Sequence, residues 1–411
     1  MPVRVLKFGG TSVGTPRRLQ RAAEQVARLV GSGESVAVVI SAMGHSTDRL
    51  LARAQQVHRS PGGRELDALL ASGEQVSASL LALALDRLGI AARSLVGAQI
   101  GLRTDSRHGG ATIMQFDPRP TVELLDRGVV PVVAGYHGVD AMGDLTTLGR
   151  GGSDTTAVAL AAAIAGTGRE VRCEILTDVP GVFTADPRLV PDARRIAHLS
   201  GHAMLAMARA GAQVMHPPAV AHGLAAGVPI LVRLAHRPGV AGTWIEPRLD
   251  ERSGATAVAR RADVGSIIVA GLPPLDRAIL LAGLRDLSPL TLASDSPDGP
   301  FVVPTASLER SLSLAHSIAS SHGATVVAST DVSVITLIGD AVPDSLPAPA
   351  GFRERSRDPW WIVPTADAVP FLQQVHAAAG LDRRRSGSRR HAVPARVHAD
   401  DGATPSPCRS T

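Results

Sequence analysis

The 411-residue sequence is poor in cysteine, aromatic residues and lysine. Its two cysteines, Cys173 and Cys408, are too few for a disulfide framework or a cysteine-rich zinc site, and they fit a reducing cytoplasm. Six Phe, three Trp and one Tyr are too few rings for the base-stacking surfaces that bind single-stranded nucleic acid. The longest apolar run, residues 155–165, is shorter than the roughly 20 residues that span a bilayer. The start of the chain also lacks a signal-peptide pattern, so we expect a cytoplasmic protein without membrane contact.

The sequence is basic overall, with a formal charge of +5 and a pI of about 10.3, but this charge is unevenly placed. Residues 382–411 hold seven Arg and three Asp, which accounts for +4 of the total. This segment has few apolar groups to bury, so we expect residues 381–411 to form a basic, disordered tail. The rest of the chain is nearly neutral, and we predict no nucleic-acid partner.

Strands and helices are expected to alternate along residues 1–247. This alternation predicts an α/β fold, a mostly parallel sheet sandwiched by helices, with ligands at the carboxyl ends of the strands. β-Branched runs predict strands and Ala-rich or amphipathic runs predict helices, among them strands at 3–8, 35–41, 129–135, 171–176 and 230–234 and helices at 66–88 and 155–164. Residues 262–380 predict a small α+β domain, with separate strands at 324–329 and 332–338.

Lys7 is the only lysine in the chain, because the other 41 basic residues are all Arg. It ends an apolar strand and precedes Gly9 and Gly10, and a turn from strand through glycine to helix presents free backbone N–H groups to an anion. A lysine is a compact point charge that can reach one oxygen in a narrow space, which an arginine does poorly. We therefore interpret Lys7 as a phosphate-binding lysine and not as a chance surface residue.

Two further loops combine glycine with polar side chains. In the first, residues 147–156, the glycines allow a substrate to approach closely, and Arg150 offers a planar fork to a carboxylate. Ser153 or Asp154 stands at the expected N-cap of the following helix. By itself this loop is equally compatible with a capped glycine turn. The second loop, residues 176–188, contains Pro-Gly and Asp-Pro pairs that force turns, and alone it predicts only a structural double turn.

Five motifs, in this order and at similar spacing, resemble those of aspartate kinases. They are Lys7-Phe8-Gly9-Gly10-Thr11-Ser12, Ser72-Gly73-Glu74, the 149–154 loop, the 177–188 loop and Gly211-Ala212-Gln213-Val214-Met215-His216-Pro217. The resemblance covers residues 1–245 and is strongest to the actinobacterial branch. It implies the amino-acid-kinase fold and the reaction L-aspartate + ATP → 4-phospho-L-aspartate + ADP. That reaction is the first step of lysine and threonine biosynthesis, or of a specialised pathway through aspartate semialdehyde.

The resemblance also implies residue roles. Lys7 and Asp154 would be catalytic, with Lys7 on the transferring phosphate and Asp154 ordering the site. Aspartate would contact Thr47, Glu74, Arg150, Gly151, Gly152 and Ser153, with Glu74 on its ammonium group and Arg150 on a carboxylate. ATP would contact Lys7, Phe8, Gly9, Gly10, Thr177, Asp178, Phe183, Arg188, Gln213 and Val214. Mg²⁺ would bridge ATP oxygens without dedicated protein ligands. The attacking carboxylate is already ionised at pH 7, so positioning and charge neutralisation suffice without an enzymic base.

Two positions depart from the family pattern. Gln213 replaces a lysine that usually lies near the ATP phosphates, and this predicts weaker nucleotide binding because glutamine carries no charge. Phe183 stands where tyrosine is common, which removes one hydroxyl contact. Neither change affects Lys7, Glu74 or Asp154, so we expect an active enzyme.

The second half of such enzymes holds paired ACT modules that bind lysine or threonine and inhibit the kinase. Residues 329–337 resemble one ACT strand, but the region is short and the expected glycine-rich effector stretch is missing. We therefore hypothesise a degenerate ACT-like domain at 262–380 and an enzyme that escapes ordinary end-product inhibition, with the amino-acid effector left open. Such modules usually pair between chains, so the resemblance implies a homodimer.

Two other functions are compatible with the sequence. One is a sibling kinase with another acidic or phosphate acceptor, although Glu74 together with Arg150 favours a free amino acid. The other is a catalytically idle paralogue that binds a ligand or a partner kinase. Gln213 and the eroded regulatory half favour the idle paralogue slightly, whereas Lys7 and Asp154 oppose it.

Overall fold

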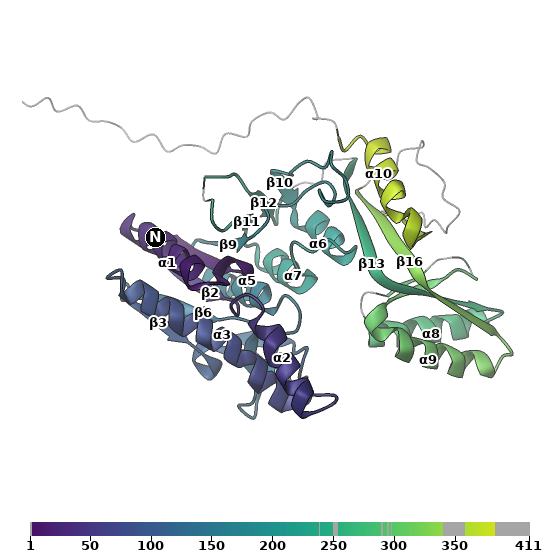
Figure 1. Cartoon of the computed structure of the whole chain (residues 1–411), viewed down its shortest axis with the longest axis horizontal. Helices are drawn as coiled ribbons and strands as arrows, with labels where there is room; N and C mark the ends of the chain where they lie inside the picture. The colour runs from purple at the N-terminus through teal and green to yellow at the C-terminus, as the bar shows by residue number, and fades with distance from the viewer. Residues whose placement is uncertain are drawn as a thin grey trace, which may run out of the picture.

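The computed structural model describes residues 2–237, 239–249, 254–288, 291–293, 296, 298–339 and 358–382. Within these ranges the chain forms two bodies, seen in Figure 1 as a purple-to-teal first part and a green-to-yellow second part. The tail that the sequence predicts at 381–411 lies outside the described residues from position 383 onwards.

The first part is built around a sheet with eight described strands in the order β10-β12-β11-β9-β1-β2-β6-β3. Neighbouring strands are parallel except for β12, which is antiparallel to β11. The central strands are rich in Val and Ile and almost fully buried, as strands between two helix layers must be. The strands are β1 (Val3–Phe8), β2 (Ser35–Ile40), β3 (Ala92–Leu95), β6 (Val130–Ala134), β9 (Val171–Thr177), β10 (His198–Ser200), β11 (Ile230–Leu234) and β12 (Thr243–Glu246).

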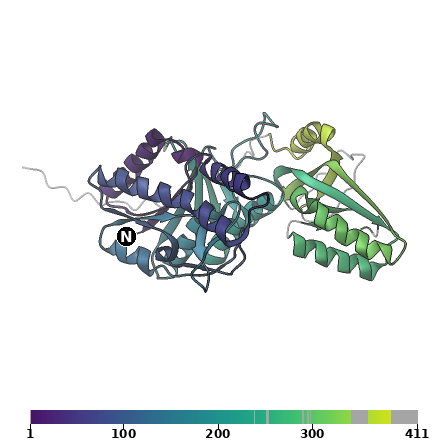
Figure 2. The same ribbon diagram turned by 60° about the horizontal axis from the view of Figure 1, so that its bottom comes forward.

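Helices cover both faces of this sheet (Figure 2). On one face α1 (Pro16–Gly31) packs beside α3 (Gly63–Asp86), and on the other α5 (Gly152–Ala165) packs beside α7 (Pro217–Ala226). The remaining helices of this part are α2 (Ser46–Val57), α4 (Arg119–Asp126) and α6 (Gly201–Arg209). This arrangement confirms the α/β fold predicted from the sequence.

Helix α3 has the length and hydropathy of a membrane-spanning helix, although it lies outside the longest apolar run of the sequence at 155–165. Its inner side is buried in the core, where Ala78, Leu81 and Leu85 are fully covered. The same helix carries two buried carboxylates, Asp67 and Glu74. Because its apolar side already has a partner inside the protein, we assign α3 to the core of the first part.

A smaller sheet, in the order β5-β4-β7-β8, lies beside the first turns of α3. Its strands are β4 (Leu102–Thr104), β5 (Ile113–Phe116), β7 (His137–Val139) and β8 (Leu145–Thr147). Strand β8 leads directly into the glycine loop before α5, so this sheet helps to set the position of that loop.

The second part contains a sheet in the order β14-β15-β13-β16-β17. Its two long strands form the antiparallel ribbon prominent in Figure 1. Helices α8 and α9 pack together against one half of the ribbon, and α10 packs against the other half. The elements are β13 (Ala255–Ala270), α8 (Pro274–Leu287), β14 (Leu292–Ala293), β15 (Phe301–Pro304), α9 (Leu308–Ser320), β16 (Thr325–Gly339), β17 (Trp360–Pro364) and α10 (Ala368–Ala378).

The sequence prediction of two strands at 324–329 and 332–338 is wrong, because β16 is one continuous strand. The prediction places a break at the polar residues Thr330 and Asp331. They instead continue the strand with exposed side chains. Exposed polar residues are compatible with a strand whenever one face meets solvent.

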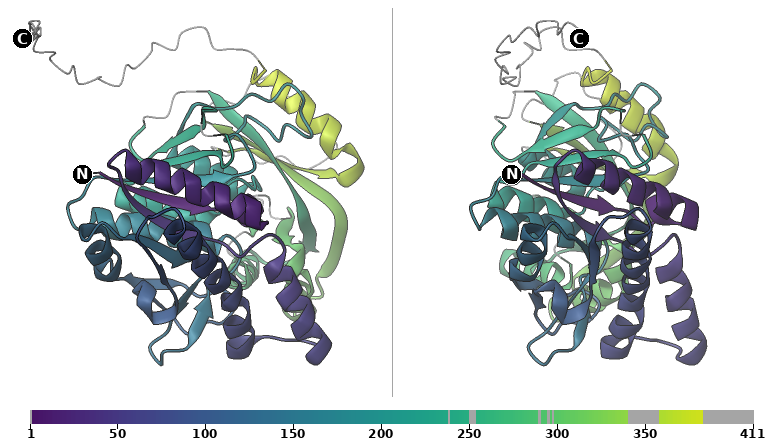
Figure 3. Two further views of the ribbon diagram at one scale, coloured as in Figure 1. Left: turned by 60° about the vertical axis from the view of Figure 1, so that its left-hand side comes forward. Right: turned by 90° about the vertical axis from the view of Figure 1, so that its left-hand side faces the viewer.

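The two parts meet at the loop that follows β9. The backbone N–H of Val258 in β13 donates to the carbonyl oxygen of Thr184, over 2.8 Å. The hydroxyl of Thr184 is 2.9 Å from Nε2 of His376 in α10. Figure 3 shows the yellow-green α10 lying against this region of the first part. The loop is therefore held by the second part as well as by the first.

Candidate active site

Lys7 occupies the carboxyl end of β1, the central strand of the parallel sheet. Its Nζ lies 2.6 Å from Oδ1 of Asp154 in the first turn of α5, and each side chain is only 11% exposed. A charged pair with so little solvent around it is attracted much more strongly than a surface pair. Residues 147 positions apart in the chain therefore meet at the edge of the sheet where ligands of parallel α/β proteins bind.

Gly9 and Gly10 form a tight backbone turn directly after Lys7. The N–H of Gly9 donates to the carbonyl oxygen of Leu176 in β9, and the carbonyl oxygen of Gly10 accepts from Gly44. A Cβ atom at Gly10 would lie 2.8 Å from the carbonyl oxygen of Ala42, so only glycine fits there. The turn thus brings the ends of β1, β2 and β9 together beside the lysine.

The loop before α5 is shaped by glycines in the left-handed region. Gly151 has φ +72°, and a Cβ atom there would lie 2.0 Å from the ring of His216. Gly151 is the N-cap and the helix begins at Gly152, so the prediction that Ser153 or Asp154 caps this helix is wrong. Both residues lie inside the first turn, and this position is what brings the carboxylate of Asp154 to Lys7.

Arg150 projects from the same loop. Its side chain is exposed and makes no ion pair with any residue that the structure describes. A guanidinium without a protein partner at the rim of a site can bind a carboxylate in two-point fashion. Ser153, by contrast, is buried beside Gly135, which can carry no side chain because a Cβ atom would lie 2.8 Å from that of Ser153.

Glu74 lies on α3, close enough to Lys7 for the charge of that lysine to act on its carboxylate. It is 3% exposed, and its Oε1 accepts a hydrogen bond from the backbone N–H of Ala42 over 3.2 Å. Its Oε2 has no hydrogen-bond partner within the described part of the chain. Burial raises the pKa of Glu74 to about 7, against the lowering effects of the Ala42 N–H and the charge of Lys7. The site thus holds a carboxylate that lacks one donor and is poised to ionise near neutral pH.

Thr47 lies in the first turn of α2 and is half-buried. The turn before it is fixed to the glycine turn, because Gly44 donates to Gly10 and Ser46 donates to Met43. Thr47 therefore follows a turn that is attached to Gly10 on the β2 side of Lys7.

His216 belongs to the site although the sequence analysis gave it no role. Its ring packs on Gly151, and burial lowers its pKa. The charge of Asp154 opposes this shift, whereas the charges of Arg150 and Lys7 add to it. These electrostatic effects place a neutral imidazole among the three charged groups. The glycine at position 151 could have indicated in the sequence that another group lies close to the backbone there. Only the fold shows that this group is the ring of His216.

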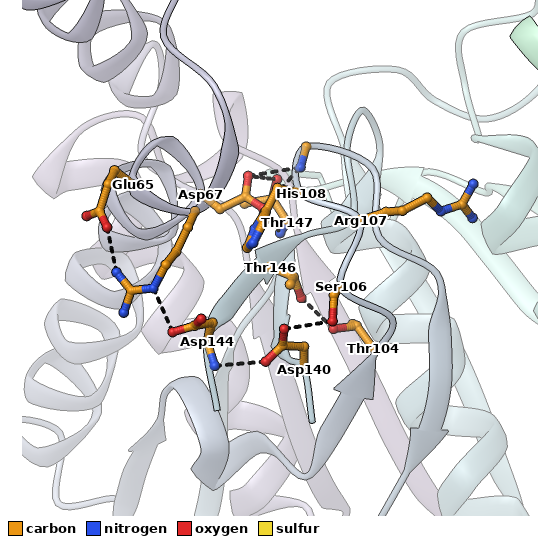
Figure 4. Close-up of polar contacts among 12 residues, drawn as sticks. Glu65, Asp67, Thr104, Ser106, Arg107, His108, Asp140, Asp144, Thr146 and Thr147 are labelled. Atoms are coloured by element: carbon orange, nitrogen blue, oxygen red, sulfur yellow. Dashed lines mark hydrogen bonds and ion pairs between the residues drawn. The ribbon is translucent and has the colours of Figure 1, made fainter. Parts of the chain in front are cut away.

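Asp67 is a second buried carboxylate that the sequence analysis did not recognise as part of this region. Its oxygens accept from the hydroxyl of Thr147 over 2.6 Å, from the N–H of Thr147 over 3.0 Å and from the N–H of Gly109. His108 Nδ1 lies 3.0 Å away. Figure 4 shows Asp67 projecting from α3 toward Thr147 and His108. Asp67 therefore ties α3, which carries Glu74, to the end of β8.

Tyr136 interacts electrostatically with both buried carboxylates of α3, Asp67 and Glu74. Its φ of 73° is the single positive value among the described non-glycine residues. Burial raises the pKa of its hydroxyl, the hydrogen bond with Thr147 lowers it, and the charges of Glu74 and Asp67 raise it further. A non-glycine residue in the left-handed region is costly and is kept where the surroundings demand it. Here the ring packs against Gly152, where a Cβ atom would lie 2.9 Å from it.

The loop after β9 holds the residues predicted to contact nucleotide. Thr177 ends β9 two strands from β2, and its hydroxyl donates to Asp178 over 3.2 Å. Phe183 is half-buried, and its backbone forms an isolated antiparallel β-bridge with Arg195. Arg188 lies apart from Lys7 in an exposed turn, where its guanidinium pairs with Asp186 at 2.7 Å. The structure thus brings Thr177 next to the glycine turn but does not bring Arg188 to the lysine.

Gln213 and Val214 lie between α6 and α7, with Gln213 exposed and Val214 packed on the core. Gly211, two residues before Gln213, lies against β13, because a Cβ atom there would lie 2.8 Å from the carbonyl oxygen of Arg260. The segment therefore runs from the second part of the molecule to His216 at the site.

Comparisons with known proteins agree with this geometry. The model of the amino acid kinase family matches residues 2–233. An aspartokinase of Thermus thermophilus is 44% identical over 275 residues, which cover 66% of each chain. The chain thus spans just under two thirds of the length of that relative. An aspartate kinase of Stutzerimonas stutzeri is 36% identical over 82% of this chain and 84% of its own.

Among solved structures, E. coli aspartokinase III in complex with aspartate and ADP has a TM-score of 0.73 and 24% identity. The match covers 92% of this chain and 99% of that one, so the shared fold extends through both parts of the molecule. The family match spans more than half of this chain, and the Stutzerimonas relative is covered over most of its length. The chain therefore belongs to the amino acid kinase family and, within it, to the aspartokinases.

Proposed function

We propose that the protein is an aspartate kinase, which transfers the γ-phosphoryl group of ATP to the β-carboxylate of L-aspartate and yields 4-phospho-L-aspartate and ADP. The observation that carries the proposal is the nearly buried pair of Lys7 and Asp154 at the carboxyl end of β1, with Glu74 in the same site. Membership of the aspartokinases adds support.

Aspartate would bind between α3 and the loop before α5. Glu74 would accept the ammonium group, which supplies the donor that its Oε2 lacks in the described structure. Arg150 would bind a carboxylate of the substrate. Thr47 and the backbone of Gly151, Gly152 and Ser153 would complete the pocket. Because the attacking carboxylate carries its own charge, these groups need only hold it in line with the phosphate.

The nucleotide would lie across the ends of β1 and β9. Lys7 would neutralise charge on the transferring phosphoryl group while Phe8, Gly9 and Gly10 line the backbone turn beside it. Asp154 would hold the Lys7 ammonium in place, at the 2.6 Å separation seen here. Thr177, Asp178, Phe183, Arg188, Gln213 and Val214 are the further nucleotide contacts that we propose. Arg188 would have to exchange its partner Asp186 for the nucleotide.

Mg²⁺ fits this site as a companion of ATP. The described residues form no cluster of three or more His, Cys, Asp or Glu side chains that could hold a metal. Magnesium in kinases is typically bound through phosphates with one or two carboxylates, so Asp154 and Asp178 are the available side chains. When bound, the ion supplies further neutralisation of the phosphate oxygens.

Purified protein mixed with ATP, Mg²⁺ and L-aspartate tests the proposal, with hydroxylamine trapping any acyl phosphate. We expect hydroxamate from aspartate and not from glutamate. Product from glutamate or another acid would favour a sibling kinase. No product from any acceptor, despite measurable ATP binding, would favour a catalytically idle paralogue.

Gln213→Lys is expected to lower the KM for ATP by about threefold to tenfold, because it adds a charged group where Gln213 offers only an amide. Gln213 is exposed, so the longer side chain fits without repacking. Initial rates at varied ATP measure the effect. Gln56→Lys adds the same charge on α2 and should leave KM unchanged. An equal change in both variants would mean that Gln213 has no specific place at the nucleotide.

Asp67→Asn is expected to lower kcat/KM for aspartate about tenfold and the free energy of unfolding by about 1–3 kcal/mol. An amide cannot accept all the hydrogen bonds that Asp67 receives from Gly109 and Thr147. Looser contact between α3 and β8 would misplace Glu74. Steady-state kinetics and thermal unfolding measure the two effects, with the exposed Asp86→Asn as control. A lower melting temperature with unchanged KM would show that Asp67 only stabilises the fold.

We further propose the domain limits 1–247 for the catalytic domain, 262–380 for a degenerate ACT-like regulatory domain and 381–411 for a basic tail.

We propose that the protein is a homodimer. This is supported by apolar side chains that β13, α8 and β16 leave exposed, namely Ile268, Leu275, Ile279 and Val327. Sedimentation equilibrium would show a monomer if this is wrong.

We also propose a cytoplasmic location, which is supported by the free, buried thiol of Cys173. Cell fractionation that finds the protein with the membranes would contradict it.

We also propose that lysine and threonine, alone or together, inhibit the enzyme only weakly. The missing glycine-rich stretch between the regulatory modules motivates this proposal. Activity measured while the two amino acids are titrated tests it. Strong inhibition below about millimolar levels, the range of ordinary effector sites, would contradict it.

A further inference from the structure

A pocket of about 310 Å³ opens on the face of the large sheet opposite Lys7. It lies between α1 and strands β1, β9, β11 and β12. Arg4 lines it, and Arg4 lies three residues before Lys7 on β1. An odd separation along a strand places two side chains on opposite faces, so this pocket is distinct from the candidate active site.

The pocket is strongly basic. Arg4, Arg28, Arg172 and Arg233 line it, and the single acidic lining residue is Glu174. Glu34 lies nearby and pairs with Arg4 and Arg172. Four guanidinium groups therefore face two carboxylates, which leaves an excess of two positive charges. Such a concentration of unbalanced positive charge in a concave site attracts anions.

The deepest arginine is held in place but not fully satisfied. Arg233 is 7% exposed, and its Nε and Nη2 donate to Oε2 of Glu174 over 2.8 and 2.7 Å. Its Nη1 has no hydrogen-bond partner within the described part of the chain. A buried charged donor without a partner is unfavourable, and an anionic oxygen would remove that penalty. Arg28 at the rim also makes no ion pair with a described residue.

Part of the lining of the pocket is apolar. Trp244 from β12, Leu231 from β11 and Leu29 from α1 contribute this part. A pocket lined by both arginine and aromatic side chains suits an organic anion better than a bare inorganic ion, because the carbon skeleton can pack on the ring. The volume is at the lower end of the range for small-molecule sites, which limits the ligand to a small molecule.

We propose that this pocket binds a small organic dianion, of the dicarboxylate or phosphomonoester class, through Arg28, Arg172 and Arg233. The proposal does not depend on the kinase activity, since no residue of the pocket belongs to the proposed aspartate or nucleotide site. It concerns equilibrium binding alone, so a binding measurement tests it directly.

A site-resolved titration keeps this pocket separate from anion binding at Lys7. The chain contains three tryptophans, Trp244, Trp360 and Trp361, so the full-length protein labelled with 5-fluorotryptophan gives three fluorine resonances. Trp244→Phe assigns the resonance of the pocket. Malonate represents the dicarboxylates and glycerol 3-phosphate the phosphomonoesters, with acetate and glycerol as controls at constant ionic strength. We expect one or both dianions to shift the Trp244 resonance saturably, with a Kd below about 1 mM.

Rim variants then decide whether the arginines hold the anion. Arg28→Gln and Arg172→Gln should each weaken binding about tenfold. Arg28 is exposed and Arg172 partly so, and the fold should therefore persist. Replacing Arg233 would instead remove the shortest ion pair of the buried Glu174. Arg21→Gln, two turns earlier on α1 and outside the pocket, is the matched control and should bind normally. A non-saturating shift, or equal affinity in all three variants, would overturn the proposal.

Discussion

Lys7→Ala is expected to lower kcat for aspartate phosphorylation by about 10²–10³, the range seen when one preorganised electrostatic contact to a transition state is removed. The transferring phosphoryl group carries negative charge that must be neutralised where it develops, and Lys7 is the one lysine available in the chain. Its Nζ is already fixed by Asp154 at 2.6 Å, in surroundings that exclude most water. The hydroxamate assay with saturating ATP and aspartate measures the loss.

The variant Lys7→Arg tests whether a positive charge at this position is sufficient or whether the shape of the ammonium group is also needed. A guanidinium keeps the positive charge but is wider than an ammonium group, and the space at the end of β1 is bounded by the glycine turn and by Asp154. We expect this variant to remain mostly inactive. Full activity in Lys7→Arg would show that any positive charge suffices, and activity in Lys7→Ala would remove Lys7 from the mechanism altogether.

Folding has to be checked in the same experiment. Lys7→Ala leaves Asp154 nearly buried without its partner, which is destabilising. The double variant Lys7→Ala with Asp154→Asn removes both charges and should recover part of the lost stability but none of the activity. Thermal unfolding of the three proteins distinguishes loss of catalysis from loss of structure.

The sequence predicted those features of this molecule that arise from local pattern. The β-branched run of β2 and the apolar run of β1 predicted buried parallel strands, and the glycines after Lys7 predicted a backbone turn at the carboxyl edge of the sheet. The turn does not leave every N–H free for an anion, as the sequence predicts, because the N–H of Gly9 donates to Leu176. These predictions succeed because a strand or a turn depends on neighbours in the chain. Positive φ at Gly149 and Gly151 likewise agrees with the glycine-rich composition of the loop before α5.

Contacts between distant segments could not be predicted in the same way. Asp67 looks like an ordinary residue of an amphipathic helix, and only the fold places Thr147 and Gly109 around it, 80 and 42 positions away. His216 gains its position because Gly151 leaves space for its ring. The continuous strand β16 was missed for a related reason, since its polar residues are tolerated only because that stretch of the ribbon is left exposed.

The second large effect concerns Glu74. We expect kcat/KM for aspartate to rise with pH through about 7 and then level off, because only the ionised carboxylate can pair with the substrate ammonium group. Burial has raised the pKa of Glu74 to about 7, so a growing fraction of free enzyme is protonated below that pH. The pH dependence of kcat/KM reports ionisation in the free enzyme. The value of kcat/KM should therefore fall about tenfold for each pH unit well below the pKa of Glu74.

Glu74→Gln should abolish this pH step and lower kcat/KM at pH 8 by about 10²–10³, since an amide cannot neutralise an ammonium group in a dry site. The matched control is Glu65→Gln, which lies on the same helix with its side chain exposed. A pH step that persists in Glu74→Gln would assign the titration to another group.

The same substitution should stabilise the protein. The pKa of Glu74 in the folded state lies above its ordinary value of 4.5, so folding favours the protonated form. The contribution of this group to the stability of the folded state is therefore greatest below about pH 4.5 and is lost as pH rises through about 7. The shift corresponds to a cost on the order of 3 kcal/mol at pH 8.

The glutamine side chain of the Glu74→Gln variant carries no charge at any of these pH values. We therefore expect the variant to melt at a higher temperature than the native protein at pH 8 and at a similar one near pH 5. Equal melting temperatures at both pH values would mean that the carboxylate is better solvated than its burial suggests. A gain in stability together with a loss of turnover would instead identify Glu74 as a residue kept for substrate binding at the expense of the fold.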